Sequence, residues 1–118
     1  MYARDDSANA ERWQRLPPGD HVDAAAESFR MLADPTRLRL LWLLCGAELD
    51  VSALAAATGA ARPAVSQHLA KLRMTGLVST RREGRRVLYR ARGGHVRRLL
   101  AEALEAAEHV VTGAPEHG

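Results

Sequence analysis

Two histidines begin and end the last long apolar stretch of the chain, HVRRLLAEALEAAEH at residues 95–109. If that stretch is one helix, His95 and His109, which are 109 − 95 = 14 residues apart, are separated by about 21 Å along its axis. One chain therefore cannot bring both imidazoles to a single metal ion. At about 100° per residue, the two histidines still lie on nearly the same stripe of the helix. That stripe borders an apolar face made by Val96, Leu99, Ala103, Ala107 and Val110.

Antiparallel pairing of two copies of this helix would place His95 of one copy beside His109 of the other. Two equivalent sites per dimer would result, each spanning the interface. Imidazole and carboxylate ligands without a thiolate suit Ni(II), Co(II) or Zn(II). Helical angle alone places Glu105 nearer to the stripe than Glu108. The residues also allow a plainer interpretation, in which both histidines are ordinary polar edges of a dimerisation helix.

A second group of side chains has the chemistry to bind DNA. The segment PAVSQHLAKLRMTG, residues 63–76, has a helical period, and Val65, Leu69 and Leu72 fall on the side that would pack on a core. The other side is small and polar near its N-terminal end, which suits a helix entering the major groove. Its candidate DNA contacts, for bases and phosphates together, are Arg62, Pro63, Ser66, Gln67, Lys71 and Arg73. His68 borders the core side, where we expect a structural role or a relay between helices.

Four arginines surround a turn in the next segment, RREGRR at residues 81–86. Like charges at the tip of a hairpin repel one another, and a phosphate backbone lying against the tip would offset that cost. The segments LVSTRR and RRVLYRAR alternate with a period of two around Glu83-Gly84, which predicts a β-hairpin. The predicted phosphate contacts are Arg81, Arg82, Arg85 and Arg86. A solvated turn beside an ordinary helical pair is the alternative.

The elements that position these residues follow from caps and periodicity. We expect a flexible N-terminal arm over residues 1–20 with a short helix around Trp13, one domain over 21–110, and a flexible tail over 111–118. Asp34-Pro35 supplies an N-cap and a first-turn proline for the apolar helix PTRLRLLWLLC, which should lie centrally in the core. A short helix over 51–58 ends at Gly59, and a tight turn joins it to the helix beginning at Pro63.

Composition narrows the class of protein. With 118 residues the chain suits one domain, and its formal net charge of +3 permits a polyanionic partner without requiring one. A single cysteine, Cys45, excludes an intramolecular disulfide and favours a small core residue in a reducing compartment. No apolar stretch reaches the roughly 18 residues of a membrane span, and the N-terminus has no signal-peptide core. We expect a soluble cytoplasmic protein. Nucleophile–base pairs and phosphate loops are not recognisable, which argues against an enzyme.

Four segments together resemble one known family: FRMLADPTRLRLLWLL, VSALAAATG, PAVSQHLAKLRMTGLV and REGRRVLYR. Over roughly residues 22–110 the sequence resembles the ArsR/SmtB family of winged-helix repressors. The resemblance implies a mainly α fold with a β-hairpin wing (α+β), a winged helix-turn-helix. It also implies a homodimer formed by the first and last helices, which binds operator DNA and is released when a metal ion binds.

The metal ligands implied by the resemblance depend on the branch of the family. The thiolate site of one subset is absent, because ELDVSAL contains no cysteine. A second subset places four ligands on the last helix, and here Gly93 and Ala106 replace two of them. The nickel- and cobalt-responsive KmtR-like branch is most similar, through FRMLAD, VSQHLAKLRM, HVRRL and AEH. By that resemblance the ligands are His95, Glu108, His109 and His117. Gly118 stands where that branch has a second tail histidine, so Glu116 or water would complete the site, or the site would be weaker.

The resulting prediction is a transcriptional repressor that binds double-stranded operator DNA as a homodimer and responds to Ni(II), Co(II) or Zn(II). By this hypothesis, metal binding fixes the crossing of the two last helices and thereby changes the spacing of the two DNA-reading helices. Two alternatives stay open. One is a regulator of the same fold with another inducer or none. The other is a metal-buffering protein with incidental basic charge.

Overall fold

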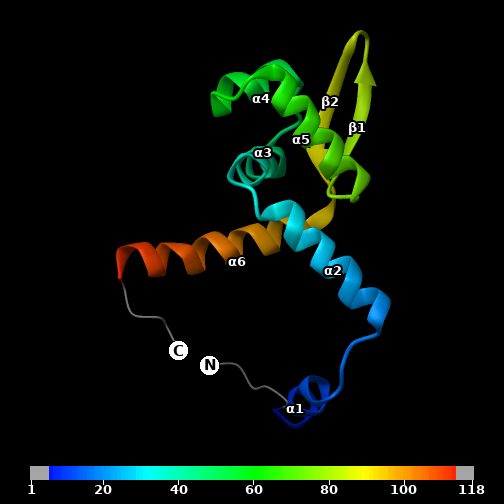
Figure 1. Cartoon of the computed structure of the whole chain (residues 1–118), viewed down its shortest axis with the longest axis vertical. Helices are drawn as coiled ribbons and strands as arrows, with labels where there is room; N and C mark the ends of the chain where they lie inside the picture. The colour runs from blue at the N-terminus through cyan, green and yellow to red at the C-terminus, as the bar shows by residue number, and fades with distance from the viewer. Residues whose placement is uncertain (1–5, 114–118) are drawn as a thin grey trace.

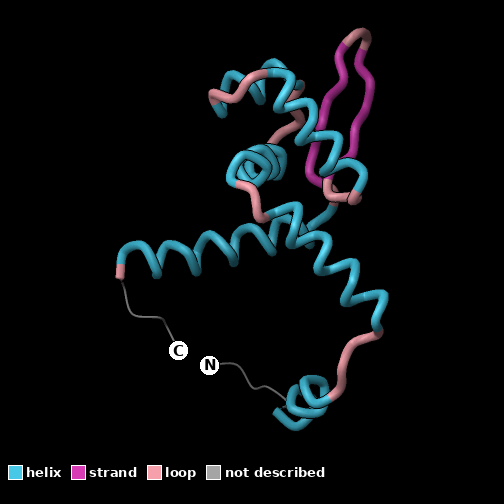
Figure 2. Tube along the Cα trace, viewed as in Figure 1, coloured by secondary structure: helices cyan, strands magenta, loops and turns pink. Residues whose placement is uncertain are grey.

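The computed structural model describes residues 6–113, which form six helices and one β-hairpin (Figure 1). In chain order the elements are α1 (Asp6–Gln14), α2 (Gly19–Leu32), α3 (Pro35–Gly46), α4 (Val51–Thr58), α5 (Arg62–Met74), β1 (Val78–Glu83), β2 (Arg86–Ala91) and α6 (Gly93–Thr112). The expected order of helices followed by a hairpin and a last helix is confirmed. Helices predominate, and the two strands are the only sheet among the described residues (Figure 2).

Helix α3 is the central helix, as its apolar sequence predicts. Asp34 caps it, because its carboxylate accepts a hydrogen bond of 2.9 Å from the backbone N–H of Arg37. Leu40, Leu41 and Leu44 of α3 are buried, and the helix packs against α2, α4, α5, α6 and β2. The buried core comprises Leu40, Leu41, Leu44, Leu54, Ala55, Val65, Leu69, Leu72, Leu77, Val78, Leu88, Val96 and Leu100.

Helices α4 and α5 form the predicted helix-turn-helix. Asp50 caps α4 by accepting a 2.9 Å hydrogen bond from the backbone N–H of Ala53. Gly59 ends α4 in the left-handed conformation, at φ +74°, which a residue with a Cβ adopts only at a cost. Helix α5 begins at Arg62, one residue earlier than the expected start at Pro63.

The hairpin forms as predicted, but its turn lies one residue further along the chain. The strands pair in a register that places Glu83 opposite Arg86, so the two loop residues are Gly84 and Arg85 rather than Glu83 and Gly84. Gly84 has φ +61°, whereas no residue other than glycine has a positive φ among the described residues. Glycine at the first loop position with a negative φ at the second matches a type II′ turn. The other edge of β2 pairs with Leu49 through an isolated antiparallel bridge to Tyr89.

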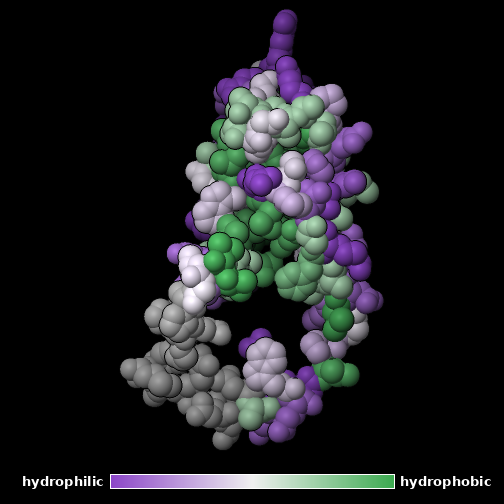
Figure 3. All heavy atoms as spheres, turned by 60° about the vertical axis from the view of Figure 1, so that its left-hand side comes forward, coloured by the Kyte–Doolittle hydropathy of each residue, from purple (hydrophilic) through white to green (hydrophobic). Residues whose placement is uncertain are grey.

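Helices α2 and α6 extend away from the core in different directions (Figure 1). No residue of α2 is buried, and in α6 only Val96 and Leu100 are. Hydrophobic side chains lie at the top of the opening between these two arms (Figure 3). Large apolar side chains left exposed on them are Val22, Phe29, Val110 and Val111. An amphipathic helix with its apolar face in water requires a partner, which residues 6–113 of the single chain do not supply.

The predicted arm and tail differ from the structure at their boundaries. Helix α1 occupies nine residues of the arm and includes Trp13, as expected, and α2 already begins at Gly19. Helix α6 continues to Thr112 and ends at Gly113, so the first two residues of the predicted tail are helical. Residues 114–118 of the tail, including His117, lie outside the described residues. The mobility of arm and tail stays a prediction.

Candidate nucleic-acid interface and metal-ligating residues

The exposed face of α5 has the features of a DNA-reading surface. Val65, Leu69 and Leu72 are completely buried on its inner side, which fixes which side chains point outward. Ser66 and Gln67 are exposed, and within residues 6–113 neither side chain has a hydrogen-bond partner. Their donors and acceptors are therefore available to base edges. Pro63, Lys71, Arg73 and Arg62 are exposed on the same helix, as predicted.

An arginine connects α5 to the end of α2. The guanidinium of Arg37 donates to the backbone oxygen of Met31 at 2.8 Å and to that of Arg30 at 3.5 Å. It also lies 3.3 Å from Nδ1 of His68 on α5. His68 thus faces the core side of α5 as predicted, and through Arg37 it connects the reading helix to an arm helix. The sequence pattern contains no signal for this link, because its partners are 6 to 31 residues apart.

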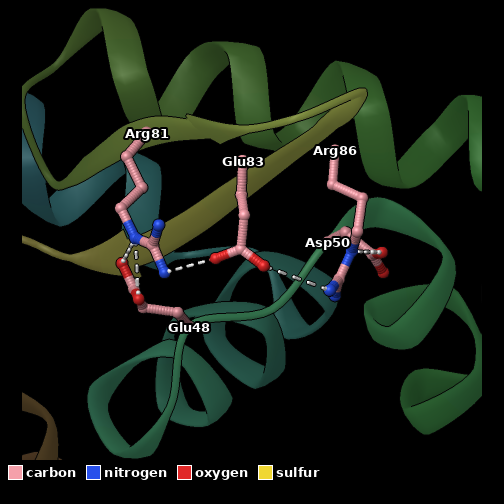
Figure 4. A network of polar contacts seen from close by, with 5 residues as sticks. All are labelled: Glu48, Asp50, Arg81, Glu83 and Arg86. Carbon is pink, nitrogen blue, oxygen red and sulfur yellow. Dashed lines mark hydrogen bonds and ion pairs between the residues drawn. The ribbon is translucent and has the colours of Figure 1, made fainter.

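The four wing arginines occupy two different environments. Arg81 donates from Nε to both carboxylate oxygens of Glu48, at 3.0 and 2.9 Å, and its Nη2 lies 3.0 Å from Glu83 (Figure 4). Arg86 pairs with Asp50 at 3.2 Å and lies 3.9 Å from Glu83. Arg82 and Arg85 are exposed, and in the part of the chain that the structure describes they make neither a hydrogen bond nor an ion pair.

The pKa values of three residues in these ion pairs, Glu48, Asp50 and Arg81, are shifted. The hydrogen bond from Arg81 lowers the pKa of the Glu48 carboxyl, and burial opposes it. Two carboxylates, Glu48 first and then Glu83, raise the pKa of Arg81. For Asp50 the largest cause of the lowered pKa is the hydrogen bond from the backbone N–H of Ala53, with Arg86 adding to it. Glu48, Asp50 and Arg81 are therefore charged at neutral pH.

Sequence reasoning missed the acidic partners of the wing. Asp50 precedes the helical segment VSAL, so the N-cap rule could have identified its first role. Its second role, as the partner of Arg86, depends on a contact 36 residues along the chain. Glu48 has no local signal at all.

Three of the predicted metal ligands, His95, Glu108 and His109, lie along α6, and within residues 6–113 they are not gathered into one site. His95 is exposed in the first turn of α6, and His109 is partly buried near its end, next to the exposed Glu108. Over residues 6–113, no three His, Cys, Asp or Glu side chains are close enough to hold one ion. Nδ1 of His95 lies 2.9 Å from Nη2 of Arg98. The donor types suit a divalent metal, but a site would need ligands from a second chain or from the tail.

One part of the apolar face of α6 packs in the chain's own core, and the other part is exposed to solvent. Val96, which was expected to belong to the pairing stripe, is 7% exposed and lies in the chain's own core with Leu100. Beyond Leu100 the stripe is exposed, and Val110 is 82% accessible to solvent. Val96 is thus unavailable for pairing with another copy, whereas Ala103, Ala107 and Val110 are exposed on the rest of the stripe.

Cys45 behaves as the small core residue that was predicted. It is partly buried and packs against the core, and burial raises the pKa of its thiol. Its backbone oxygen accepts a 2.7 Å hydrogen bond from Arg97 of α6. The raised pKa disfavours the thiolate, which is the form that would bind a metal.

Comparison with known proteins adds three findings. The family described as "Bacterial regulatory protein, arsR family" matches residues 34–80. The HTH-type transcriptional regulator KmtR of Mycobacterium tuberculosis is 50% identical over 100 residues, which cover 85% of this chain and 77% of KmtR. The HTH-type transcriptional repressor SmtB of the same organism is 37% identical over 107 residues, which cover 91% of this chain and 79% of SmtB.

A solved structure shares the architecture. The solution structure of a homodimeric winged helix-turn-helix DNA-binding domain from Mycobacterium bovis, described as a possible ArsR-family transcriptional regulator, matches with a TM-score of 0.73. The two proteins are 33% identical, and the match covers 100% of both chains. The fold of helices and wing is therefore that of a DNA-binding domain.

Proposed function

The chain belongs to the ArsR family of bacterial regulatory proteins, and from this membership we propose that it is a metal-responsive transcriptional repressor that acts as a homodimer on operator DNA. Ni(II) or Co(II) is the proposed inducer, with Zn(II) as the alternative. The observation that carries the proposal is the exposed face of α5, whose Ser66 and Gln67 have no partner in the described chain and lie on a helix packed beside β1 of the wing. No described helix is long and apolar enough to cross a membrane. The cytoplasm, where DNA is found, is the proposed location.

A homodimer is supported by the two arms. The exposed Val22 and Phe29 on α2 and the exposed Val110 and Val111 on α6 form apolar faces that a second copy would cover. The homodimeric relative from M. bovis shares this fold. A symmetric dimer carries two α5 helices, which read two half-sites of an operator.

We assign the inducer site to His95 of one subunit together with Glu108 and His109 of the other, with His117 from the tail. The site is proposed across the interface because no three ligands gather within residues 6–113 of one chain. Bound there, a divalent cation would supply a cross-link between the two α6 helices. Under this assignment, the ligands from the two subunits lie apart when no metal is bound.

The fold offers two connections from the arms to the DNA-reading elements. Helix α6 begins at Gly93, two residues after β2 ends at Ala91, so a change in the crossing of two α6 helices would move the wings. Arg37 joins the end of α2 to His68 on α5. Both connections would carry a change at the dimer interface to the DNA contacts. A coupling free energy of about 1–3 kcal/mol, or roughly 5- to 150-fold in affinity, is typical of such linkage.

The decisive experiment measures binding to the DNA upstream of the chain's own gene, with and without Ni(II), Co(II) and Zn(II). We expect the wild-type protein to bind metal-free and to be released by the inducer. The double variant H95A/H109A should bind DNA equally well and should no longer respond. The matched pair E108Q and E105Q decides between the two carboxylates. Release of the double variant by nickel would contradict the site assignment.

A second candidate function is a repressor of the same fold that senses no metal. The altered ligand set favours it, because Gly93, Ala106 and Gly118 stand where related branches of the family have ligands. Under this alternative, DNA binding is steeply salt-dependent and none of the three metals changes the affinity.

A further inference from the structure

We propose that the four wing arginines have two different roles: Arg82 and Arg85 bind the DNA backbone, whereas Arg81 and Arg86 are positioning residues that hold the wing to residues 48–50. This inference rests on the proposed DNA-binding function and changes the role of two predicted contacts. It makes the α3–α4 connection part of the DNA-binding apparatus. The segment Glu48-Leu49-Asp50 is called the strap below.

The strap is held to the wing by its backbone and by its side chains. Leu49 and Tyr89 exchange two backbone hydrogen bonds, of 3.1 and 2.9 Å. Side chains alternate along an extended segment, so Glu48 and Asp50 point to the face opposite that of Leu49. On that face they meet Arg81 and Arg86 (Figure 4).

The strap also fixes the wing to the helix-turn-helix. The carboxylate of Asp50 accepts the N-capping hydrogen bond of α4 through one oxygen and pairs with Arg86 through the other. One side chain thus joins the tip of the wing to the first helix of the motif. Glu83 lies between Arg81 and Arg86 and connects the two ion pairs into a network of five residues.

The charge of this network disfavours phosphate. Arg81 and Arg86 contribute +2, and Glu48, Asp50 and Glu83 contribute −3, so the five residues sum to −1. To reach a phosphate, Arg81 would have to exchange two carboxylates for it. That exchange gains little, because one anionic partner replaces others.

The two other arginines point elsewhere. Arg82 pairs across the hairpin with Val87, whereas Arg81 pairs with Leu88, so the two arginines lie on opposite faces of the wing. Arg85 occupies the turn itself. Both are exposed and have no partner among the described residues, so their charge is uncompensated and available to DNA.

Salt dependence separates the two roles. Each phosphate contact contributes about 0.9 to the slope of log affinity against log salt, or roughly 3.5-fold in affinity between about 50 and 200 mM. We expect R82Q and R85Q each to lower the slope by about 0.9. R81Q and R86Q should weaken binding by the same factor at every salt concentration and leave the slope unchanged. In a double-mutant cycle, E48Q should be coupled to R81Q and additive with R82Q.

A second measurement needs no DNA. Hydrogen exchange at the amides of Leu49 and Tyr89 should become faster in R81Q and R86Q and stay as in the wild type in R82Q and R85Q. Unchanged exchange in all four variants would overturn the positioning role. A slope lowered equally by R81Q and R82Q would overturn the division as well. If the wild-type protein binds no DNA, the proposed function fails, while the exchange data still test the strap.

Discussion

The exposed end of α6 leads to a prediction about assembly: Val110→Ala should weaken the homodimer without unfolding the subunit. Val110 is 82% exposed in the single chain and lies ten residues beyond Leu100, the last buried residue of the helix. The substitution removes two methyl-sized groups, worth about 0.8 kcal/mol each when buried. With 82% of that surface available for burial, the loss is about 1.3 kcal/mol per copy.

Symmetry doubles this loss, because each dimer contains two copies of Val110. The expected cost is therefore about 2.6 kcal/mol per dimer, or a dissociation constant raised roughly 70-fold. Sedimentation velocity over a range of protein concentrations, in the presence of a chelator, measures this constant directly. Operator affinity should fall at concentrations below the new dissociation constant.

Leu100→Ala is the matched control on the same helix. Leu100 is 1% exposed within one chain, so its truncation should lower the free energy of unfolding by about 2–5 kcal/mol. Denaturation by urea at a fixed concentration of dimer measures that change. The reasoning is refuted if Val110→Ala leaves the dimer constant within threefold of the wild type, since the second half of α6 would then not be part of the interface.

Three further predictions concern the reading helix, the inducer site and the cap of α3. Gln67→Ala should reduce discrimination at one base pair of the operator by about 1–3 kcal/mol and leave the salt slope unchanged, as measured by competition with mutated operators. Arg98→Gln should tighten nickel binding in a calorimetric titration, because the Arg98 guanidinium 2.9 Å from Nδ1 of His95 competes with a cation for that nitrogen; equal affinities would contradict this. The hydrogen bond from the backbone N–H of Arg37 lowers the pKa of Asp34 in the folded protein. The stabilisation by the Asp34 carboxylate should therefore be complete above the unfolded-state pKa of about 4. It should be lost as the pH falls through the lower folded-state pKa. Asp34→Asn should retain the cap without that pH dependence, and Asp34→Ala should cost about 1 kcal/mol in urea denaturation at neutral pH.

Local patterns were sufficient for most elements of the fold. The caps at Asp34 and Gly59, the apolar period of α5 and the alternation in the wing each involve residues within one or two turns of one another. The position of the wing turn was wrong by one residue, because the pairing register, with Glu83 opposite Arg86, places Gly84 and Arg85 in the loop. The sequence pattern also placed Val96 on the pairing stripe of α6, whereas in the structure Val96 packs in the chain's own core.

Local sequence patterns predicted only part of the chemistry of the candidate site. That α5 presents Ser66 and Gln67 outward followed from its helical period, since the buried leucines determine the opposite face. The same patterns did not predict that Arg81 and Arg86 are neutralised, because their carboxylate partners lie 33 and 36 residues away in the sequence.

The sequence by itself determined which segments become helices or strands and which side chains of α5 can face DNA, because both depend on periodicity and capping over a few residues. Tertiary structure alone decided which arginines are free for phosphate and how the arms connect to the reading helix. Ion pairs and hydrogen bonds act over a few ångströms in space, and only the folded chain brings Glu48 to Arg81 and Arg37 to His68.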